Sequence, residues 1–297
     1  MLLVALLIPL SLASLAFVAI LTRAAIAQRA TPKPEVLGLG AIVCFFDTLG
    51  IGSFAPTTAW FKFRKLVPDR LIPPTMLVGL TPPVLVETGY FLWKLGVKVD
   101  PVLLFGSATA VLLGGLVGAP MVARARVWVV QLTVAIGLLL AAIAYTMSNL
   151  NWMPVGGTAA GLPPLLTAVA IAASFGFGVL LNFGVGNYAP TLVFLSLLGM
   201  DPRLCFPVMA SGAALMGTGA GIRHIQFGQM DLKVVVGLAL GGIPGVLVAA
   251  YIVVSMKLEY LRWLVIVVVV YAAAVMARAA YLGWKQHKAQ GATVPLL

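Results

Sequence analysis

The sequence predicts an all-α polytopic membrane protein. Two inverted repeats, each a re-entrant helix hairpin followed by three transmembrane helices, are expected, with one extra N-terminal helix. The composition, the distribution of basic residues and an internal repeat predict this fold. Of 297 residues, 62% are hydrophobic and 9% are charged, and the mean hydropathy is +1.09. Because a soluble domain carries about a quarter charged residues, the composition excludes a soluble enzyme, a disordered chain and a disulfide-rich secreted module.

Seven stretches have the roughly 20 apolar residues that a membrane-spanning helix needs. They are 2–21, 72–93, 101–122, 127–147, 204–222, 234–254 and 259–277. The first stretch has the length of a signal peptide, and residues 25–27 resemble a cleavage site. However, no basic residue precedes it, and Arg23, Arg29 and Lys33 follow it. We therefore expect a retained anchor with its N-terminus outside.

Two further apolar regions, 36–61 and 163–198, are interrupted by Gly50-Ile51-Gly52 and by Gly184-Val185-Gly186. Each region either crosses the bilayer once or enters and returns as a hairpin. Basic residues collect in cytoplasmic loops, and hairpins place 14 of the 19 Lys and Arg residues inside, whereas single crossings divide them 10 to 9. The 14 are Arg23, Arg29, Lys33, Lys62, Arg64, Lys65, Arg70, Arg124, Arg126, Arg223, Lys233, Arg278, Lys285 and Lys288. The charge distribution therefore favours hairpins and a cytoplasmic C-terminus.

The same rule accounts for the net charge of +11, which in a soluble protein would suggest nucleic acid. The expected partner is the lipid bilayer, not a nucleic acid, and the sequence leaves the oligomeric state open. The two cysteines, Cys44 and Cys205, lie in apolar runs as small hydrophobic residues. The Met and His residues show no clustered ligand spacing, so no metal or cofactor is expected.

The two glycine interruptions are copies of one another. Gly50–Thr57 aligns with Gly184–Thr191 without a gap, and five of the eight positions are identical. Equivalent loops of the two repeats differ in charge. The basic loop 62–70 corresponds to the nearly neutral loop 199–203, and the uncharged segment 148–162 corresponds to the basic segment that begins at Arg278. Opposite charge character indicates opposite sides of the membrane, as in inverted repeats. The expected units are an N-terminal helix with a basic loop (1–35), repeat 1 (36–147), an extracytoplasmic linker (148–162), repeat 2 (163–280) and a cytoplasmic tail (281–297).

The two hairpin tips form the candidate binding site. Ser53 and Asn187 are favoured N-cap residues, and Pro56 and Pro190 suit the first turn of a helix. Each tip would thus present a helix N-terminus, with free amides and partial positive charge, to the middle of the membrane. A small oxyanion or organic anion would bind there. The candidate residues are Gly50, Gly52, Ser53, Phe54, Thr57, Gly184, Gly186, Asn187, Tyr188 and Thr191. The alternative is that such glycines only pack helices closely, which explains Gly114, Gly115, Gly118, Gly241, Gly242 and Gly245.

Two carboxylates lie well inside apolar segments, Asp47 before the first tip and Glu87 in the span 72–93. Intramembrane ionisable groups are costly and mark functional sites. Both are candidates for carrying a coupling proton, with Glu87 preferred, while a structural role for Asp47 stays open. Leu181 stands opposite Asp47 in the second repeat, so any coupling is expected to be asymmetric.

At its two tips the chain resembles the TauE/SafE family of membrane permeases, also called the sulfite exporter or TSUP family. Members have two homologous halves, each with a glycine cluster and a later Gly-Gly-x-x-Gly segment, matched here by Gly114–Gly118 and Gly241–Gly245. The resemblance covers 36–280. It implies export or uptake of sulfite, sulfonates such as sulfoacetate, or related organic anions across a bacterial inner membrane. Where many members have Gly-x-Gly-Gly-Gly, this chain has Ser53-Phe54 and Asn187-Tyr188, and such bulkier tips suit an organic anion.

The expected function is secondary transport of a small anion by alternating access, and proton coupling through either Glu87 or Asp47 stays open. A passive anion channel is the alternative, because re-entrant hairpins also build channels. An enzyme is not expected: the chain has no Gly-x-Ser-x-Gly elbow, no paired carboxylate motif and no His/Glu metal cluster.

Overall fold

The computed structural model describes residues 2–68, 71–95, 98–118, 126–150, 157–181, 186–228 and 230–291. This part of the chain is helical, and its one β-bridge joins Ala159 to Met200. The helices are α1 (Leu2–Ala27), α2 (Pro34–Thr48), α3 (Phe54–Arg64), α4 (Ile72–Lys94), α5 (Pro101–Gly118), α6 (Val127–Asn149), α7 (Pro164–Leu181), α8 (Tyr188–Leu197), α9 (Pro202–Phe227), α10 (Leu232–Ser255) and α11 (Leu258–Gly291).

Local sequence signals explain several helix starts. Pro101 and Pro164 are the first residues of α5 and α7, where the missing N–H removes no helix hydrogen bond. Asp201 and Asp231 precede α9 and α10, and their carboxylates accept backbone hydrogen bonds of 2.9 to 3.1 Å from the first turn. Each carboxylate thus satisfies amides that have no partner within the helix.

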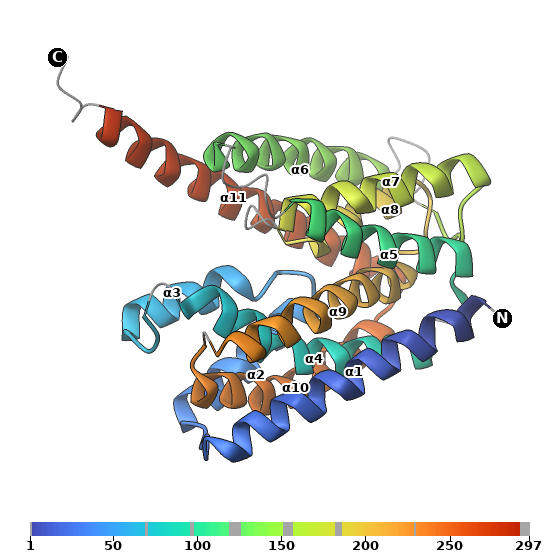
Figure 1. The fold of residues 1–297 in the computed structure, drawn as a ribbon. Coiled ribbons are helices and arrows are strands. Elements are labelled where there is room, and N and C mark those ends of the chain that lie inside the picture. The colour runs from blue at the N-terminus through green and yellow to red at the C-terminus, as the bar shows by residue number, and fades with distance from the viewer. Residues whose placement is uncertain are drawn as a thin grey trace.

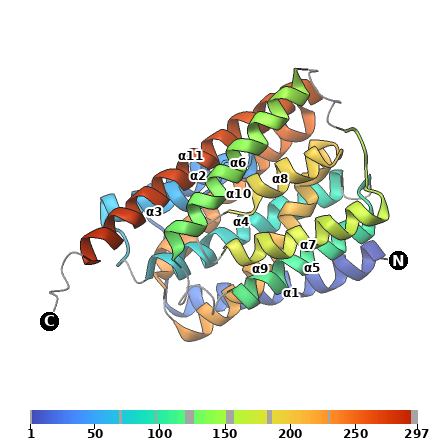
Figure 2. The same cartoon turned by 90° about the horizontal axis from the view of Figure 1, so that it is seen from above.

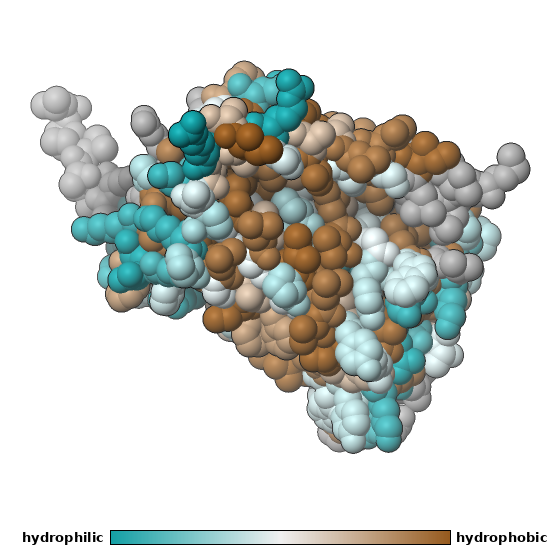
Figure 3. Space-filling model, turned by 90° about the horizontal axis from the view of Figure 1, so that it is seen from below, coloured by the Kyte–Doolittle hydropathy of each residue, from teal (hydrophilic) through white to brown (hydrophobic). Residues whose placement is uncertain are grey.

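Eight of the described helices are long and apolar enough to cross a membrane: α1, α4, α5, α6, α7, α9, α10 and α11. They carry large apolar side chains on the outside, among them Leu12, Leu140 and Val248, which are 63%, 62% and 55% exposed. Figure 3 shows the same on one face, where brown apolar surface fills the middle and hydrophilic residues gather toward the edges. Such an apolar surface suits lipid. The chain is a multi-pass membrane protein, as its composition predicts.

Both expected interruptions are present. α2 ends at Thr48 and α3 begins at Phe54, while α7 ends at Leu181 and α8 begins at Tyr188. One difference is the length of α7, whose 18 residues are sufficient to span a bilayer, whereas α2 has 15. A second difference is α11, which continues as a helix to Gly291, past the expected start of the tail at 281.

In each interrupted pair, the start of the first helix lies beside the end of the second. For α2 and α3, Glu35 accepts a hydrogen bond of 2.8 Å from Nε of Arg64 and one of 3.1 Å from Nε1 of Trp60. For α7 and α8, the backbone N–H of Ala159 donates to the carbonyl of Gly199 at 3.2 Å. The first contact uses charged side chains and the second uses the main chain.

The most extensive helix–helix interfaces join the first half of the chain to the second. α2 packs on α10, α7 on α5, α6 on α11, and α4 on both α9 and α10. Glycines allow this closeness, because a Cβ at Gly241 would overlap the carbonyl of Leu37 and one at Gly114 would overlap the carbonyl of Phe175. These two glycines are therefore packing residues, as the simpler interpretation of the glycine segments expects.

The two ends of the bundle differ. Figures 1 and 2 place α3 and the C-terminal end of α11 at one end, and the start of α1 at the other.

The largest hydrophobic cluster contains the end of α4 and the start of α5, with buried Leu92 and Leu103. It also contains the end of α8 and the start of α9, with buried Leu195 and Phe206. The bundle is therefore densely packed where these helix ends meet.

Candidate functional site

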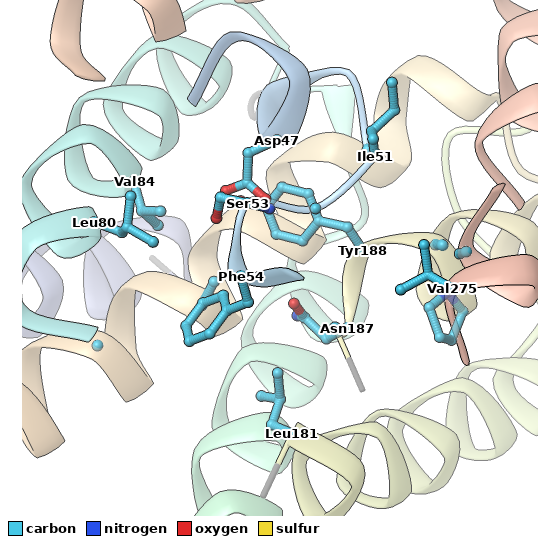
Figure 4. A pocket seen from close by; sticks show the side chains of 18 of the residues that line it. Asp47, Ile51, Ser53, Phe54, Leu80, Val84, Leu181, Asn187, Tyr188 and Val275 are labelled. Atoms are coloured by element: carbon cyan, nitrogen blue, oxygen red, sulfur yellow. Dashed lines mark hydrogen bonds between the residues drawn. The ribbon is translucent and has the colours of Figure 1, made fainter. Parts of the chain in front are cut away.

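The two interrupted regions meet at one cavity of about 230 Å³. Residues 50–54 of the first tip and 186–190 of the second line it, together with Asp47 and Leu181 (Figure 4). Its other walls come from α4, α6, α9 and α11 and are mostly apolar. They consist of Leu77, Leu80, Thr81, Val84, Leu138, Ala213, Met216, Gly217, Tyr271, Ala272, Val275 and Met276. The cavity thus combines polar tips with apolar walls.

The glycines of the first tip are required by its backbone. Gly50 and Gly52 have φ angles of +96° and +89°, in the region that glycine adopts without steric cost. Gly186 of the second tip does not have a positive φ, and a Cβ there would meet nothing within 4 Å. The first tip therefore needs glycine for its backbone conformation, whereas at the second tip the absence of a side chain leaves open space. Gly184 lies outside the described residues.

Ser53 and Asn187 occupy the N-cap positions of α3 and α8, as expected, but neither side chain forms a capping hydrogen bond. The backbone N–H of Ser53 instead donates to the Asp47 carboxylate at 2.7 Å. The Asn187 amide donates to the carbonyl of Met209 at 3.5 Å. A carboxylate of the protein therefore lies at the first tip, and an amide lies at the second.

Two of the expected binding residues lie away from the cavity. The Thr57 side chain is fully buried and donates to the carbonyl of Ser53 at 2.7 Å. Thr191 is 3% exposed, and its hydroxyl has no partner within the protein. Both side chains point into the packing around the first turn of their helices, and neither lines the cavity.

The two intramembrane carboxyls are placed differently. Asp47 lines the cavity. Glu87 is 1% exposed and does not line it. The hydroxyls of Tyr188 and Thr48 lie beside the Glu87 carboxyl, but neither reaches hydrogen-bond geometry, so both oxygens of Glu87 lack a partner within the protein. The structure thus places Asp47, and not Glu87, at the cavity.

The sequence motifs did not reveal the residues of the other walls, such as Thr81 on α4, Met216 on α9 and Tyr271 on α11. These helices are apolar on every side, so hydrophobic periodicity does not show which side faces a cavity. None of the described lining residues is Lys, Arg or His. Among the described lining residues, backbone amides and helix N-termini are therefore the groups that could attract an anion.

The fold defines a multi-pass helical membrane protein with a cavity at two broken helices. The family model of the sulfite exporter TauE/SafE matches residues 165–297. The second part of the chain, which contains the second tip, is therefore similar to this family, in agreement with the resemblance seen in the sequence. It is a family of membrane transporters and not of enzymes, which agrees with the expectation from the motifs. No curated protein and no solved structure matches the chain.

Proposed function

We propose that the chain is a secondary transporter that carries a small organic anion across the cell membrane by alternating access. The observation that carries the proposal is the meeting of both glycine tips at one cavity. The TauE/SafE match supports transport. The substrate class, the mechanism and the orientation with N-terminus outside and C-terminus in the cytoplasm are part of the proposal.

The contacts at the ends of each interrupted pair support re-entrant hairpins. Glu35 of α2 bonds to Arg64 of α3, and Ala159 before α7 bonds to Gly199 after α8. A segment that crossed the bilayer once would separate such residues by about 30 Å. In this proposal both pairs enter the membrane and return to the side from which they came.

The packing of the helices supports two inverted repeats. α2 and α7 begin the proposed repeats, and each packs on a helix of the other repeat, α10 and α5 respectively. The interfaces between α4 and α9 and between α6 and α11 join equivalent helices. Such reciprocal packing is expected when two similar units are related by a pseudo-twofold axis.

The second tip is the proposed anion site. The first amides of α8 lack partners within the helix, and the Tyr188 hydroxyl is buried without a partner within the protein. Asn187 and Gly186 lie at the same end of the cavity. Backbone amides and the helix dipole together suit a sulfonate or carboxylate group.

The apolar walls favour an organic anion with a short apolar part over sulfite itself. A cavity needs only about 10–15 Å³ to hold one water molecule, so a cavity of about 230 Å³ has room for more than a three-oxygen ion. Leu80, Val84 and Val275 lie opposite the tips (Figure 4). An alkyl group would bury its surface against these side chains while the charged group binds at α8.

A series of linear alkanesulfonates tests the substrate class. With the purified protein in detergent, affinity is expected to increase by up to about fourfold per added methylene, from ~0.8 kcal/mol per buried CH₂, and to level off when the cavity is full. Sulfite is the reference without an alkyl group. Equal binding of all chain lengths, or binding of sulfite alone, would show that the apolar walls do not contact the ligand.

Transport by the same protein in liposomes tests the mechanism. A carrier is expected to show saturable uptake and exchange of a labelled alkanesulfonate across the membrane. An ohmic current faster than a conformational cycle would instead identify a passive anion channel. Absence of both transport and binding would refute the anion site.

A further inference from the structure

The first tip already holds an anionic group of the protein. The Asp47 carboxylate accepts the Ser53 N–H at 2.7 Å, beside the N-terminus of α3. Figure 4 shows this carboxyl directed toward Ser53 and the ring of Tyr188. Asp47 therefore occupies the place at α3 that a substrate anion is proposed to take at α8.

The second tip has no such carboxylate. Leu181, the residue equivalent to Asp47, lines the same cavity (Figure 4). Next to it stands Asn187 (Figure 4), while the Tyr188 ring lies beside Asp47 and Ser53. An anion bound at α8 therefore shares the cavity with the Asp47 carboxyl. If Asp47 is ionised, the two negative charges repel each other across an enclosure with apolar walls.

A second carboxyl lies behind the cavity wall. Glu87 is 1% exposed, and neither of its oxygens has a partner within the protein. The Thr48 hydroxyl beside it already donates to the carbonyl of Cys44 at 2.9 Å. That hydroxyl therefore has no proton left to donate to an ionised Glu87 carboxylate.

The groups that face the two carboxyls give them no positive partner. On α2 these are Asp47 and Cys44, on α4 Glu87, and on α8 Tyr188. None of the described residues in this set is a cation. Glu87 is buried and Asp47 is only partly exposed, so ionising both carboxyls without a cation is costly. The pair therefore takes up a proton readily from water when the cavity is open.

We propose that Asp47 and Glu87 share one exchangeable proton and that its binding is required for the anion to bind at α8. This inference rests on the proposed function. With Asp47 ionised, the protein's own carboxylate excludes the substrate; with the proton on Asp47, the substrate is the only anion in the cavity. Anion and proton therefore bind together, and the transporter moves one proton with each substrate anion.

Proton uptake on binding tests the proposal. Butanesulfonate is titrated into the full-length protein in detergent by calorimetry, in buffers that differ in their ionisation enthalpy. The expected result is one proton taken up per anion at a pH at which the free pair has lost its proton, and a Kd that increases by about tenfold per pH unit in that range. Asp47→Asn and Glu87→Gln are each expected to abolish the uptake. The control Glu35→Gln removes a partly exposed carboxylate at the start of α2 and is expected to leave the proton uptake unchanged.

A transplanted carboxylate tests the same idea without removing Asp47. Leu181→Asp places an acid at the second tip, where Asp47 stands at the first. Butanesulfonate binding is expected to fall by at least tenfold at neutral pH and to recover as the pH is lowered. Leu181→Asn is the matched control without a charge and is expected to show the pH dependence of the wild type, without the additional loss at neutral pH.

The outcomes separate this proposal from the function on which it rests. Butanesulfonate binding without proton uptake would overturn the shared proton and leave anion transport standing. If no anion binds, the infrared band of the carboxylic acid decides the inference on the protein alone. One band that titrates, and that both single variants remove, supports a shared proton. Two bands, each removed by only one variant, overturn it.

Discussion

The backbone conformation of the first tip needs glycine and that of the second tip does not, and a pair of alanine variants tests this difference. Gly52 has a φ of +89°, and a Cβ there would meet nothing within 4 Å. The cost of Gly52→Ala is therefore conformational, about 1–2 kcal/mol for an L-residue at positive φ. Gly186 has neither a positive φ nor a close neighbour, so Gly186→Ala is expected to be neutral or to stabilise by about 0.4–1 kcal/mol.

Thermal unfolding in detergent measures this difference. At ~2–4 °C per kcal/mol for chains of about 150–250 residues, Gly52→Ala is expected to unfold roughly 2–8 °C below the wild type. Gly186→Ala is expected to unfold at or above the wild-type temperature while binding butanesulfonate more weakly, because its methyl group enters the cavity. Gly137→Ala on α6, which also has nothing within 4 Å of its Cβ, is the control for both measurements.

Two results would refute this reasoning. Wild-type stability of Gly52→Ala would mean that the first tip does not need its left-handed backbone. Wild-type affinity of Gly186→Ala for every alkanesulfonate would mean that the second tip does not face the ligand.

Two further predictions concern packing and charge. Gly241→Leu is expected to separate α2 from α10 and to lower the free energy of unfolding by at least about 1–3 kcal/mol. Size-exclusion chromatography should show loss of folded protein for this variant, whereas the control Gly137→Leu should elute like the wild type. Normal elution of both variants would contradict the packing. The Arg64 hydrogen bond lowers the pKa of Glu35, so the stability from this pair is present above the ordinary pKa of a glutamate and is lost as the pH falls through the lowered value. Glu35→Gln is expected to remove this acid-side change in unfolding temperature, and an unchanged profile would show that the pair contributes nothing.

The sequence predicted the helices and the meeting of the two glycine tips because both leave local signals. Apolar runs bounded by Pro, Gly and charged residues placed α4, α5, α6, α9 and α10 within a few residues of their observed ends. The duplicated Gly-x-Gly motif identified two segments that, far apart in the chain, line one cavity. A motif that occurs twice is informative because chance rarely repeats it in order.

The details of the site depended on geometry that the sequence does not express. Thr57 belongs to the tip motif, but its position four residues after Ser53 turns its hydroxyl back onto the helix. Asp47 reaches Ser53 only because the Gly50 and Gly52 backbone folds the chain back. Glu87 seemed the better proton carrier from its depth in a span, yet Asp47 is the carboxyl that lines the cavity.

The interlocked packing has a consequence for how the protein is made. α2 packs mainly on α10, and α5 packs mainly on α7. These early helices therefore enter the membrane before the helices on which they pack have been synthesised. Their glycine-lined grooves stay unfilled during that interval, and such distant pairings slow folding. Assembly therefore finishes only after α10 has been inserted, and two halves severed in the 148–162 linker would have to be made in the same membrane before either could complete its structure.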